Sequence, residues 1–341
     1  MAFGASGPDS PRKPKAKRPR VEDPSSPGVR LIKTSRGELW FDDGNLVLAA
    51  GGTAFRVYKG ILAKSSPVLA DVLSEPQPEK CEGCDVLHLR GDDPVDVARV
   101  LELIFCSPDL YYDGKPVRFS VVASWIRMAD KYKMHRILDH ALARLRSFFS
   151  DDASQWRDAL RNHASRSIKV NAEDAIAAVK LARLTGTFSL LPTALYTCSQ
   201  LSSPTLLFGV FRDDTSGTVE KLAEDDIVRC LDAREALTRL NLLSTFQVWN
   251  PRVSHMCMDT VNCLATFEHQ TRAIREGSVV HQYTLSATIR EVIGDVYDAF
   301  ILCFACEREI EKRGEKARQD VWRMLPTFFG LDMPNWMLDT Q

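Results

Sequence analysis

The sequence has almost no net charge and no long apolar segment. Its 44 Lys and Arg residues against 45 Asp and Glu residues leave a net charge of −1, so the chain as a whole lacks the positive excess that favours nucleic acid or acidic membranes. No apolar run reaches the roughly 18 residues of a membrane-spanning helix, and the N-terminus has no apolar signal-peptide core. We expect an intracellular protein, nuclear or cytoplasmic, that binds neither nucleic acid nor membrane directly.

Enzyme signatures are also missing. The sequence has no glycine-rich dinucleotide or phosphate-binding loop, no His-Glu-x-x-His and no Gly-x-Ser-x-Gly. Acidic pairs such as Asp42-Asp43 and Asp225-Asp226 do not converge, because adjacent side chains point to opposite faces of a strand or lie about 100° apart on a helix. We predict no catalytic residues, no cofactor and no enzymatic activity.

The nine cysteines form an odd number spread along a long chain, which is typical of reduced thiols rather than a disulfide framework. One set in the second half of the sequence has zinc-like spacing, namely Cys257, Cys263, Cys303 and Cys306. These residues either bind zinc through four thiolates or pack as small hydrophobic side chains. Because the second pair falls in a strongly amphipathic helical pattern, and free cysteine is often buried, the sequence favours packing without a metal.

Residues 1–33 are rich in Pro, Ser, Gly and basic side chains and contain almost nothing to bury. This composition predicts a disordered tail. Within it, a short basic run fits a nuclear-import signal, with Lys17, Arg18 and Arg20 as the candidate residues. The alternative is a solvated basic tail that makes at most a weak electrostatic contact.

Residues 40–73 have the pattern of a strand, a turn, a second strand and a helix. Apolar residues alternate along both strands, the period expected of half-buried strands. Gly51-Gly52 lies between the strands and favours a hairpin turn, because glycine reaches positive φ without a clash. Ser66 before Pro67 is a favourable helix start. With the helical patterns that follow, we predict an α+β domain over residues 36–149.

The same run resembles the start of a BTB/POZ domain. The residues that carry the resemblance are Phe55, Lys59, Ile61-Leu62-Ala63, Ser66 and, further on, Ala129-Asp130-Lys131-Tyr132; Tyr58 and Leu69 replace a histidine and a phenylalanine that are frequent in the family. The resemblance implies a protein-interaction module. Such domains dimerise through the first strand and the adjoining helices, and some of them recruit a cullin-type ubiquitin-ligase scaffold.

The resemblance therefore implies a homodimer. The candidate interface residues lie on the first strands and on the helix after Ser66, and they are Trp40, Phe41, Leu46, Leu48, Leu69 and Leu73. The alternative is that these side chains only fill the core of a monomer.

Residues 152–341 show helical patterns throughout, and the strongest runs from Leu285 to Phe304. The segment ends in aromatic residues, from Trp322 to Trp336, that we expect to dock onto the helical core. The fold class is therefore an α+β BTB/POZ domain followed by an all-α C-terminal domain. This layout resembles a large group of proteins from basidiomycetes, the mushroom-forming fungi.

Together these features predict a non-enzymatic protein-interaction module. We expect a dimerising adaptor with protein partners, which recruits clients to a cullin-type ubiquitin ligase. The alternative is a nuclear transcription-regulatory scaffold that gathers cofactor proteins through its BTB domain.

Overall fold

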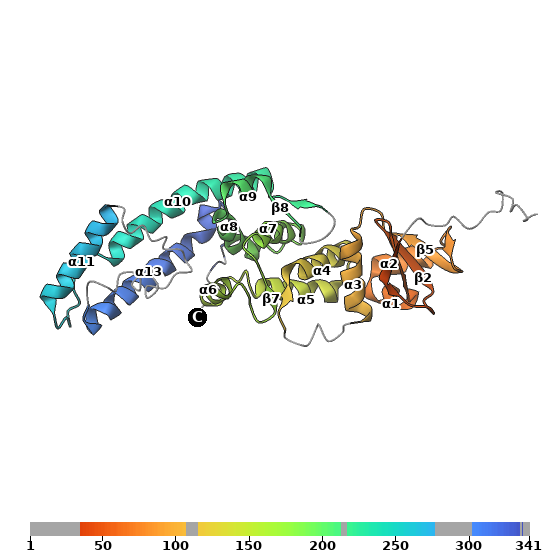
Figure 1. Ribbon diagram of the computed structural model, residues 1–341, viewed down its shortest axis with the longest axis horizontal. Coiled ribbons are helices and arrows are strands. Elements are labelled where there is room, and N and C mark those ends of the chain that lie inside the picture. The colour runs from red at the N-terminus through yellow and green to blue at the C-terminus, as the bar shows by residue number, and fades with distance from the viewer. Residues whose placement is uncertain (1–34, 107–114, 213–216, 277–301, 335, 337–341) are drawn as a thin grey trace, which may run out of the picture.

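The computed structural model describes residues 35–106, 115–212, 217–276, 302–334 and 336. The molecule is an elongated rod, with a β-sheet at one end and helix α11 (Thr260–Arg275) at the other (Figure 1). The import candidates Lys17, Arg18 and Arg20 lie outside the described residues, as does most of the helix expected from Leu285 to Phe304. Among the described helices, none is long and apolar enough to cross a membrane.

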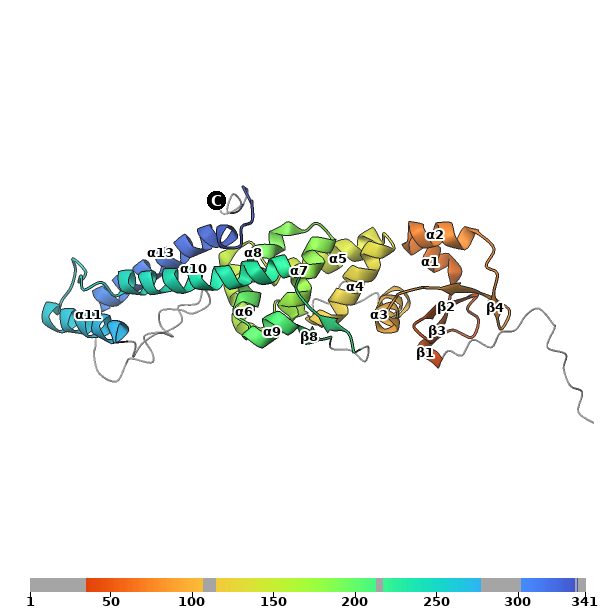
Figure 2. The same cartoon turned by 90° about the horizontal axis from the view of Figure 1, so that it is seen from above.

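The sheet at one end of the rod has the strand order β1-β3-β2-β5-β4. Helices α1 and α2 lie on one face of it (Figure 2). The bounds are β1 Ser35–Trp40, β2 Leu46–Ala50, β3 Thr53–Val57, α1 Lys59–Ser65, α2 Pro67–Ser74, β4 Lys80–Cys81 and β5 Cys84–His88.

The central strand β2 differs from the expectation of a half-buried strand, because all five of its residues are buried. Leu46 and Leu48 belong to the main core, whereas Val47 and Ala49 belong to a small apolar cluster on the other face of the sheet. A strand in the middle of a sheet that is covered on both faces has no solvated side. The alternation of the side chains was therefore predicted correctly, but the exposure of one face was wrong.

The turn and the helix start are confirmed. Gly51 and Gly52 have φ of 49° and 86° and close the antiparallel hairpin of β2 and β3, which a residue with a Cβ would do less readily. Ser66 accepts a hydrogen bond at Oγ from the Leu69 backbone N–H at 3.0 Å and donates one to the Tyr132 carbonyl oxygen at 2.6 Å. One buried hydroxyl therefore starts α2 and ties it to a segment 66 residues later.

Helices make up most of the remaining structure. α3, α4 and α5 pack together beside the sheet, and α7 and α8 continue the stack along the rod. The bounds are α3 Pro94–Phe105, α4 Phe119–Lys131, α5 His135–Arg146, α6 Ala153–Asn162, α7 Asp174–Leu184, the short 3₁₀ helix η2 Phe188–Leu190, α8 Leu191–Ser199, α9 Ser203–Phe208, α10 Glu224–Val248 and α13 Phe304–Phe328, with short strand pairs β6 Val117–Arg118 with β7 Ile168–Lys169 and β8 Val210–Phe211 with β9 Val219–Glu220.

One apolar core runs from the sheet into the helical region, from Leu46 to Phe329, across the expected boundary at residue 149. The fold class is confirmed as a mixed α/β N-terminal region followed by a helical C-terminal region. The division into domains at residues 149 and 152 stays a prediction.

The end of the chain returns to this core through aromatic side chains. The ring of Trp322 lies 5.4 Å from that of Trp156 and 5.1 Å from that of Trp336. Trp336 also donates from Nε1 to the Trp322 carbonyl oxygen at 3.0 Å. The structure therefore has the aromatic docking that was expected for the C-terminal residues.

Helices α10 and α13 pack side by side and extend from this core to the distal end of the rod (Figures 1 and 2). There they meet α11 around a second, separate apolar cluster. We call residues 248–276 and 302–310 the distal tip. Only α10 and α13 connect it to the main core among the residues that the structure describes.

Candidate functional site

The structure separates the dimer candidates into two sets. Leu46, Leu48, Leu69 and Leu73 are at most 4 % exposed and pack in the core of the chain itself, which agrees with the alternative that they fill a monomer. Trp40 and Phe41 are only half-buried. Of the candidates, these two remain available for a partner.

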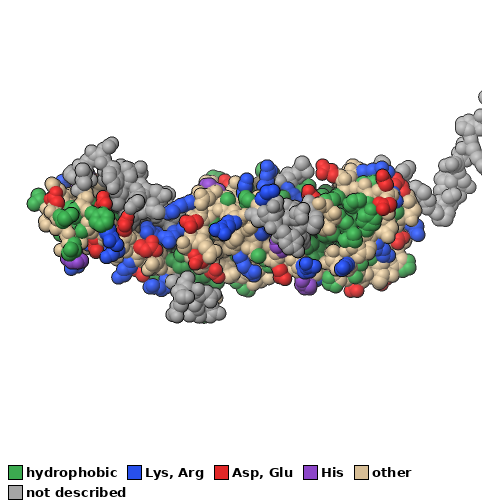
Figure 3. Space-filling model, turned by 90° about the horizontal axis from the view of Figure 1, so that it is seen from below, with side chains coloured by type: hydrophobic (Ala, Val, Ile, Leu, Met, Phe, Trp, Pro, Cys, Tyr) green, Lys and Arg blue, Asp and Glu red, His purple; other side chains and the backbone are tan. Residues whose placement is uncertain are grey.

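An aromatic patch lies beside Phe41. The centroid of the Phe41 ring is 5.1 Å from that of Tyr58 and 5.6 Å from that of Phe105, and all three side chains are half-buried. Ile61, one turn further along α1, is 45 % exposed. Figure 3 shows apolar side chains gathered on the face where α1 and α3 lie. We call Phe41, Tyr58, Ile61 and Phe105 the aromatic patch.

One hydrogen bond changes the pKa of a residue of the patch. The Tyr58 hydroxyl donates to Asp43 Oδ1 at 2.5 Å, and this bond raises the pKa of Tyr58 above its usual value. No local pattern in the sequence indicated that Tyr58 and Phe105 lie together at the surface, because they come from a helix start and a helix end 47 positions apart. The half-buried aromatic rings gathered on one surface can contribute apolar contact area to a protein interface.

Strand β1 offers a second feature on the same sheet. It pairs with β3 on one side and, among the described residues, is one of the two edge strands of the sheet, β4 being the other. The Arg36 guanidinium lies 4.4 Å from the Trp40 ring and 2.6 Å from Glu82 Oε1. An edge strand carries backbone groups that another chain can pair with, and charged side chains along it restrict which chain does so.

A network of two buried carboxylates and three partly exposed cations joins the sheet end of the rod to the helical region. Asp96 on α3 is 4 % exposed and accepts two hydrogen bonds from Arg127 on α4, both at 2.7 Å. Arg212 lies 3.7 Å from Asp96 and 2.8 Å from Glu220. Glu220, at the β8–β9 hairpin, also pairs with Lys180 on α7. We call these five residues the junction network.

The two carboxylates of the network stay ionised despite their burial. Burial alone would raise the pKa of Asp96, but the Arg127 hydrogen bonds and charge outweigh it and lower that pKa. Burial alone would also raise the pKa of Glu220, but the hydrogen bonds and charges of Lys180 and Arg212 outweigh it and lower that pKa. The network is therefore a structural tie, and no member shows the raised carboxyl pKa of a general acid.

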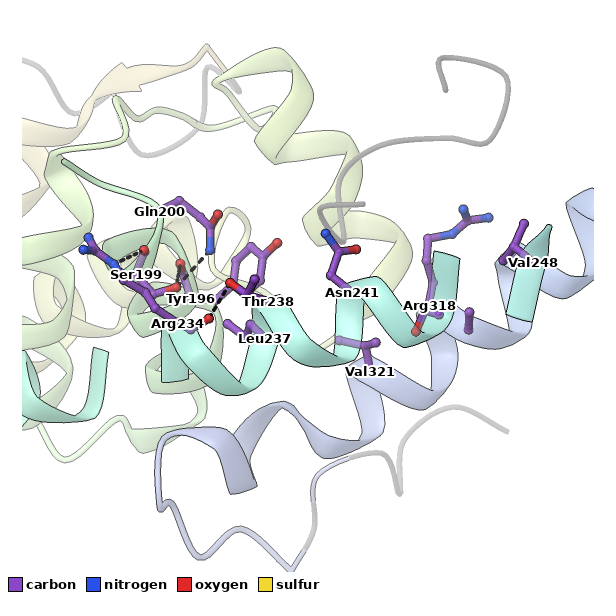
Figure 4. Close-up of a pocket in the computed structure, with 13 residues that line it drawn as sticks. Tyr196, Ser199, Gln200, Arg234, Leu237, Thr238, Asn241, Val248, Arg318 and Val321 are labelled. Carbon is purple, nitrogen blue, oxygen red and sulfur yellow. Dashed lines mark hydrogen bonds between the residues drawn. The ribbon is translucent and has the colours of Figure 1, made fainter. Parts of the chain in front are cut away.

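A groove lies between α8, α10 and α13, with a cavity of about 140 Å³. Arg234 lines it from α10 and donates to the Ser199 carbonyl oxygen at 2.7 Å (Figure 4). It also donates to Ser203 Oγ at 3.0 Å. The side chains of Gln200 and Asn241 lie along the same groove. Arg234 satisfies carbonyl groups at the end of α8, as basic side chains often do at helix C-termini. These contacts hold the helices in place and do not bring a pair of catalytic groups together.

The four cysteines with zinc-like spacing come together at the distal tip. The Sγ atoms of Cys257, Cys263, Cys303 and Cys306 all lie within 4.8 Å of one another. The prediction that Cys303 lies inside a long helix was wrong. Helix α13 begins at Phe304, and Cys303 is its N-cap with an extended backbone. The spacing of the cysteines indicated this set, but Cys263 and Cys303 are 40 positions apart, so no local pattern showed that the two pairs meet.

Three thiols of the cluster have shifted pKa values. Hydrogen bonds from the Met258 and Cys306 backbones lower the pKa of Cys303 to about 6. Burial raises the pKa of Cys306 to about 12 and that of Cys263 to about 11. Cys263 and Cys306 are buried, whereas Cys257 and Cys303 are partly exposed.

Comparison with known proteins identifies the sheet end of the rod. Residues 41–148 match the family model of the BTB/POZ domain. The search of curated proteins found no match, and the resemblance to basidiomycete proteins stays a prediction. The matched range contains the central and outer strands β2 to β5, helices α1 to α5 and the whole aromatic patch. Residues 41–148 of this chain therefore form a BTB/POZ domain, a protein-interaction module.

Proposed function

We propose that this protein is a non-enzymatic, dimerising adaptor, which recruits clients to a cullin-type ubiquitin ligase. The observation that carries the proposal is the BTB/POZ domain at residues 41–148, with its aromatic patch on the surface. BTB domains bind other proteins, and the helical region after residue 148 extends from the domain to the distal tip (Figure 1). In this proposal the domain contacts the common partner and the helical region presents the client.

At the BTB end, the aromatic patch and the β1 edge supply the two kinds of contact that an interface needs. The patch offers apolar and aromatic area, which is enriched at the centre of protein interfaces. The edge strand offers backbone donors and acceptors. A two-fold symmetric dimer is the commonest assembly in which one surface binds its own copy.

At the opposite end, the distal tip exposes four large apolar side chains. Met256, Met258, Val261 and Phe304 are 66 %, 82 %, 79 % and 67 % exposed. Each lies within two residues of a cysteine of the cluster, so the four come from segments that meet there. Exposed apolar groups that gather in one place favour protein binding, and methionine adapts to differently shaped partners. We assign the client contact to these residues.

The test is affinity purification of the tagged full chain from its native cells, read by quantitative mass spectrometry. Ile61→Asp places a charge in the aromatic patch and should remove the common partner, while Met258→Gln should remove clients only. Val228→Asp is the matched control, since Val228 is 55 % exposed on α10 and belongs to neither surface. Loss of the same partners in all three variants, or a wild-type protein that copurifies with no partner, would refute the adaptor.

Dimerisation is measured separately by light scattering coupled to size-exclusion chromatography. We expect a dimer for the wild type and for Val228→Asp, and a shift towards monomer for Ile61→Asp. A strictly monomeric wild-type chain at micromolar concentration would remove the homodimer from the proposal and leave only the common partner.

A nuclear transcription-regulatory scaffold is the second candidate function, and the basic run with Lys17, Arg18 and Arg20 in the N-terminal tail supports it. In that case chromatin or corepressor proteins replace the cullin among the copurified partners. Deleting residues 12–20 should then abolish nuclear accumulation of a fluorescently tagged chain. Unchanged nuclear accumulation after the deletion would remove the main support for this function.

A further inference from the structure

We propose that Cys257, Cys263, Cys303 and Cys306 bind one structural zinc ion, which holds the distal tip together. The four residues come from two separate parts of the chain. Cys257 lies in the loop between α10 and α11 and Cys263 in the first turn of α11, whereas Cys303 and Cys306 lie at the start of α13. The inference does not depend on the adaptor function.

The distances between the sulfur atoms fit a single metal ion. Zinc is bound tetrahedrally by thiolates at about 2.3 Å, which places the sulfur atoms about 3.8 Å apart. In the structure the Sγ atoms of Cys257 and Cys303 are 3.7 Å apart, and none of the four is more than 4.8 Å from another. A disulfide needs about 2.05 Å between its sulfur atoms. The cluster thus has the size of a mononuclear site.

The donor set selects the metal and its role. Among the described residues, four cysteine sulfurs form the cluster without a carboxylate or imidazole, and such soft ligands in a tetrahedron favour zinc. Four protein ligands also leave no open position for water or substrate, which is the arrangement of a structural rather than a catalytic zinc site. The proposed site therefore agrees with a non-enzymatic protein.

Packing alone does not account for the cluster. Cysteine that acts as a small hydrophobic residue is buried, yet Cys257 and Cys303 are partly exposed while their sulfur atoms are the pair in contact at 3.7 Å. Both residues border the apolar cluster of the distal tip, but contact with its apolar side chains does not require four sulfur atoms to converge. A shared metal ion explains why both turn inward to the buried Cys263 and Cys306.

The backbone around the cluster is arranged as a thiolate site requires. The Ser254 N–H donates to Cys306 Sγ at 3.4 Å, and the Cys303 N–H donates to Cys263 Sγ at 3.3 Å. Such donors stabilise negative charge on ligand sulfurs and orient them. Arg313 fixes the preceding loop, because it donates to the carbonyl oxygens of Asn250 and Arg252 at 3.2 and 2.7 Å.

The distal tip also needs an additional source of stability. Among the described residues, its apolar cluster has eight buried side chains, of which two are cysteines of the site, and these are separate from the main core. Cores this small rarely hold a fold without a metal or disulfide. A zinc ion would join the loop before α11, α11 itself and α13, which are the three segments that the tip must keep in contact.

The test is the metal content of the full chain, purified without chelator and measured by inductively coupled plasma mass spectrometry. We expect one zinc ion per chain in the wild type, and loss of zinc in Cys303→Ser and Cys306→Ser. Cys106→Ser is the control, because Cys106 is an exposed cysteine outside the cluster, and it should keep its zinc. Cobalt added to metal-free protein should give the intense visible absorption of a tetrahedral tetrathiolate complex.

Hydrogen exchange distinguishes a structural ion from an adventitious one. Chelation should remove amide protection from α11 and leave that of α4, which lies in the main core. Four results would each overturn the proposal: wild-type zinc no higher than in the two cysteine variants, iron in place of zinc, a disulfide among the four cysteines in the protein as purified, or unchanged α11 protection after the metal is removed.

Discussion

Replacement of Asp96 by asparagine tests the carboxylate that α3 contributes to the junction network. The carboxylate accepts two charge-assisted hydrogen bonds from Arg127 at 2.7 Å and one from Ser124 Oγ at 2.6 Å. Asparagine has the same shape but has a single acceptor oxygen and no charge. In the variant, Glu220 is the one carboxylate of the junction network that still pairs with Arg127 and Arg212.

Removing one partner of a buried ion pair costs about 3–5 kcal/mol. We expect Asp96→Asn to lower the free energy of unfolding by about 3 kcal/mol, at the lower end, because Asn still accepts one bond and Glu220 still pairs with Arg212. For a protein of this size that corresponds to a fall of about 4 °C in the melting temperature. The measurement is thermal unfolding of the full chain followed by circular dichroism.

Asp320→Asn is the matched control. It also removes one carboxylate charge, but Asp320 is 51 % exposed, and its ion pair among the described residues is with Arg323 at 3.2 Å within the same helix. Exposed pairs contribute little, so we expect a change within about 0.5 kcal/mol. An Asp96→Asn protein as stable as Asp320→Asn would refute the structural role of the junction network.

The pH dependence gives a second check on the same variant. Because the pKa of Asp96 is lower in the folded chain than its ordinary 3.8, its contribution to stability is fully present above that value and is lost as the pH falls through the folded pKa. The difference in melting temperature between wild type and Asp96→Asn should stay constant from pH 8 to about pH 5 and shrink below about pH 4. A difference that already falls between pH 8 and pH 5 would contradict the lowered pKa.

Three further substitutions test other contacts by the same unfolding assay. Ser66→Ala should cost about 2–3 kcal/mol, because it removes the α2 cap and leaves the buried Tyr132 carbonyl without its donor; a loss below about 1 kcal/mol would mean that water replaces the hydroxyl. Gly209→Ala should unfold the β8–β9 hairpin, since a Cβ there would lie 2.1 Å from the Glu220 carbonyl oxygen, whereas Gly60→Ala, with open space around it, should be neutral or slightly stabilising. Trp336→Ala should cost about 2 kcal/mol through the lost stacking on Trp322, and an unchanged stability would show that the C-terminal segment is not docked.

Local features of this fold could be predicted because their causes are local. The Gly51-Gly52 turn and the Ser66 helix start depend on residues within three or four positions, and both are present in the structure. The recognition of a BTB/POZ domain also used short runs in a characteristic order. Strand β2 shows the limit of such reasoning, because its burial on both faces depends on what other elements cover it.

The candidate sites were less predictable, because they assemble from distant parts of the chain. The leucines proposed for a dimer interface have the same alternation whether they face a partner or their own core. The aromatic patch joins residues from a loop, a helix start and a helix end. No period in the sequence connects such positions, so their proximity follows only from the packing of the helices on the sheet.

The sequence by itself determined the types of elements, their order and the class of interaction module, because hydrophobic period, caps and turn residues act over a few positions. Only the tertiary structure decided that Leu46, Leu48, Leu69 and Leu73 fill the core of the chain, and that Phe41 contributes to a surface patch instead. It also brought Cys257 and Cys263 to Cys303 and Cys306, about 40 residues further on. Such contacts depend on how α10 and α13 pack along their whole length, which no local pattern encodes.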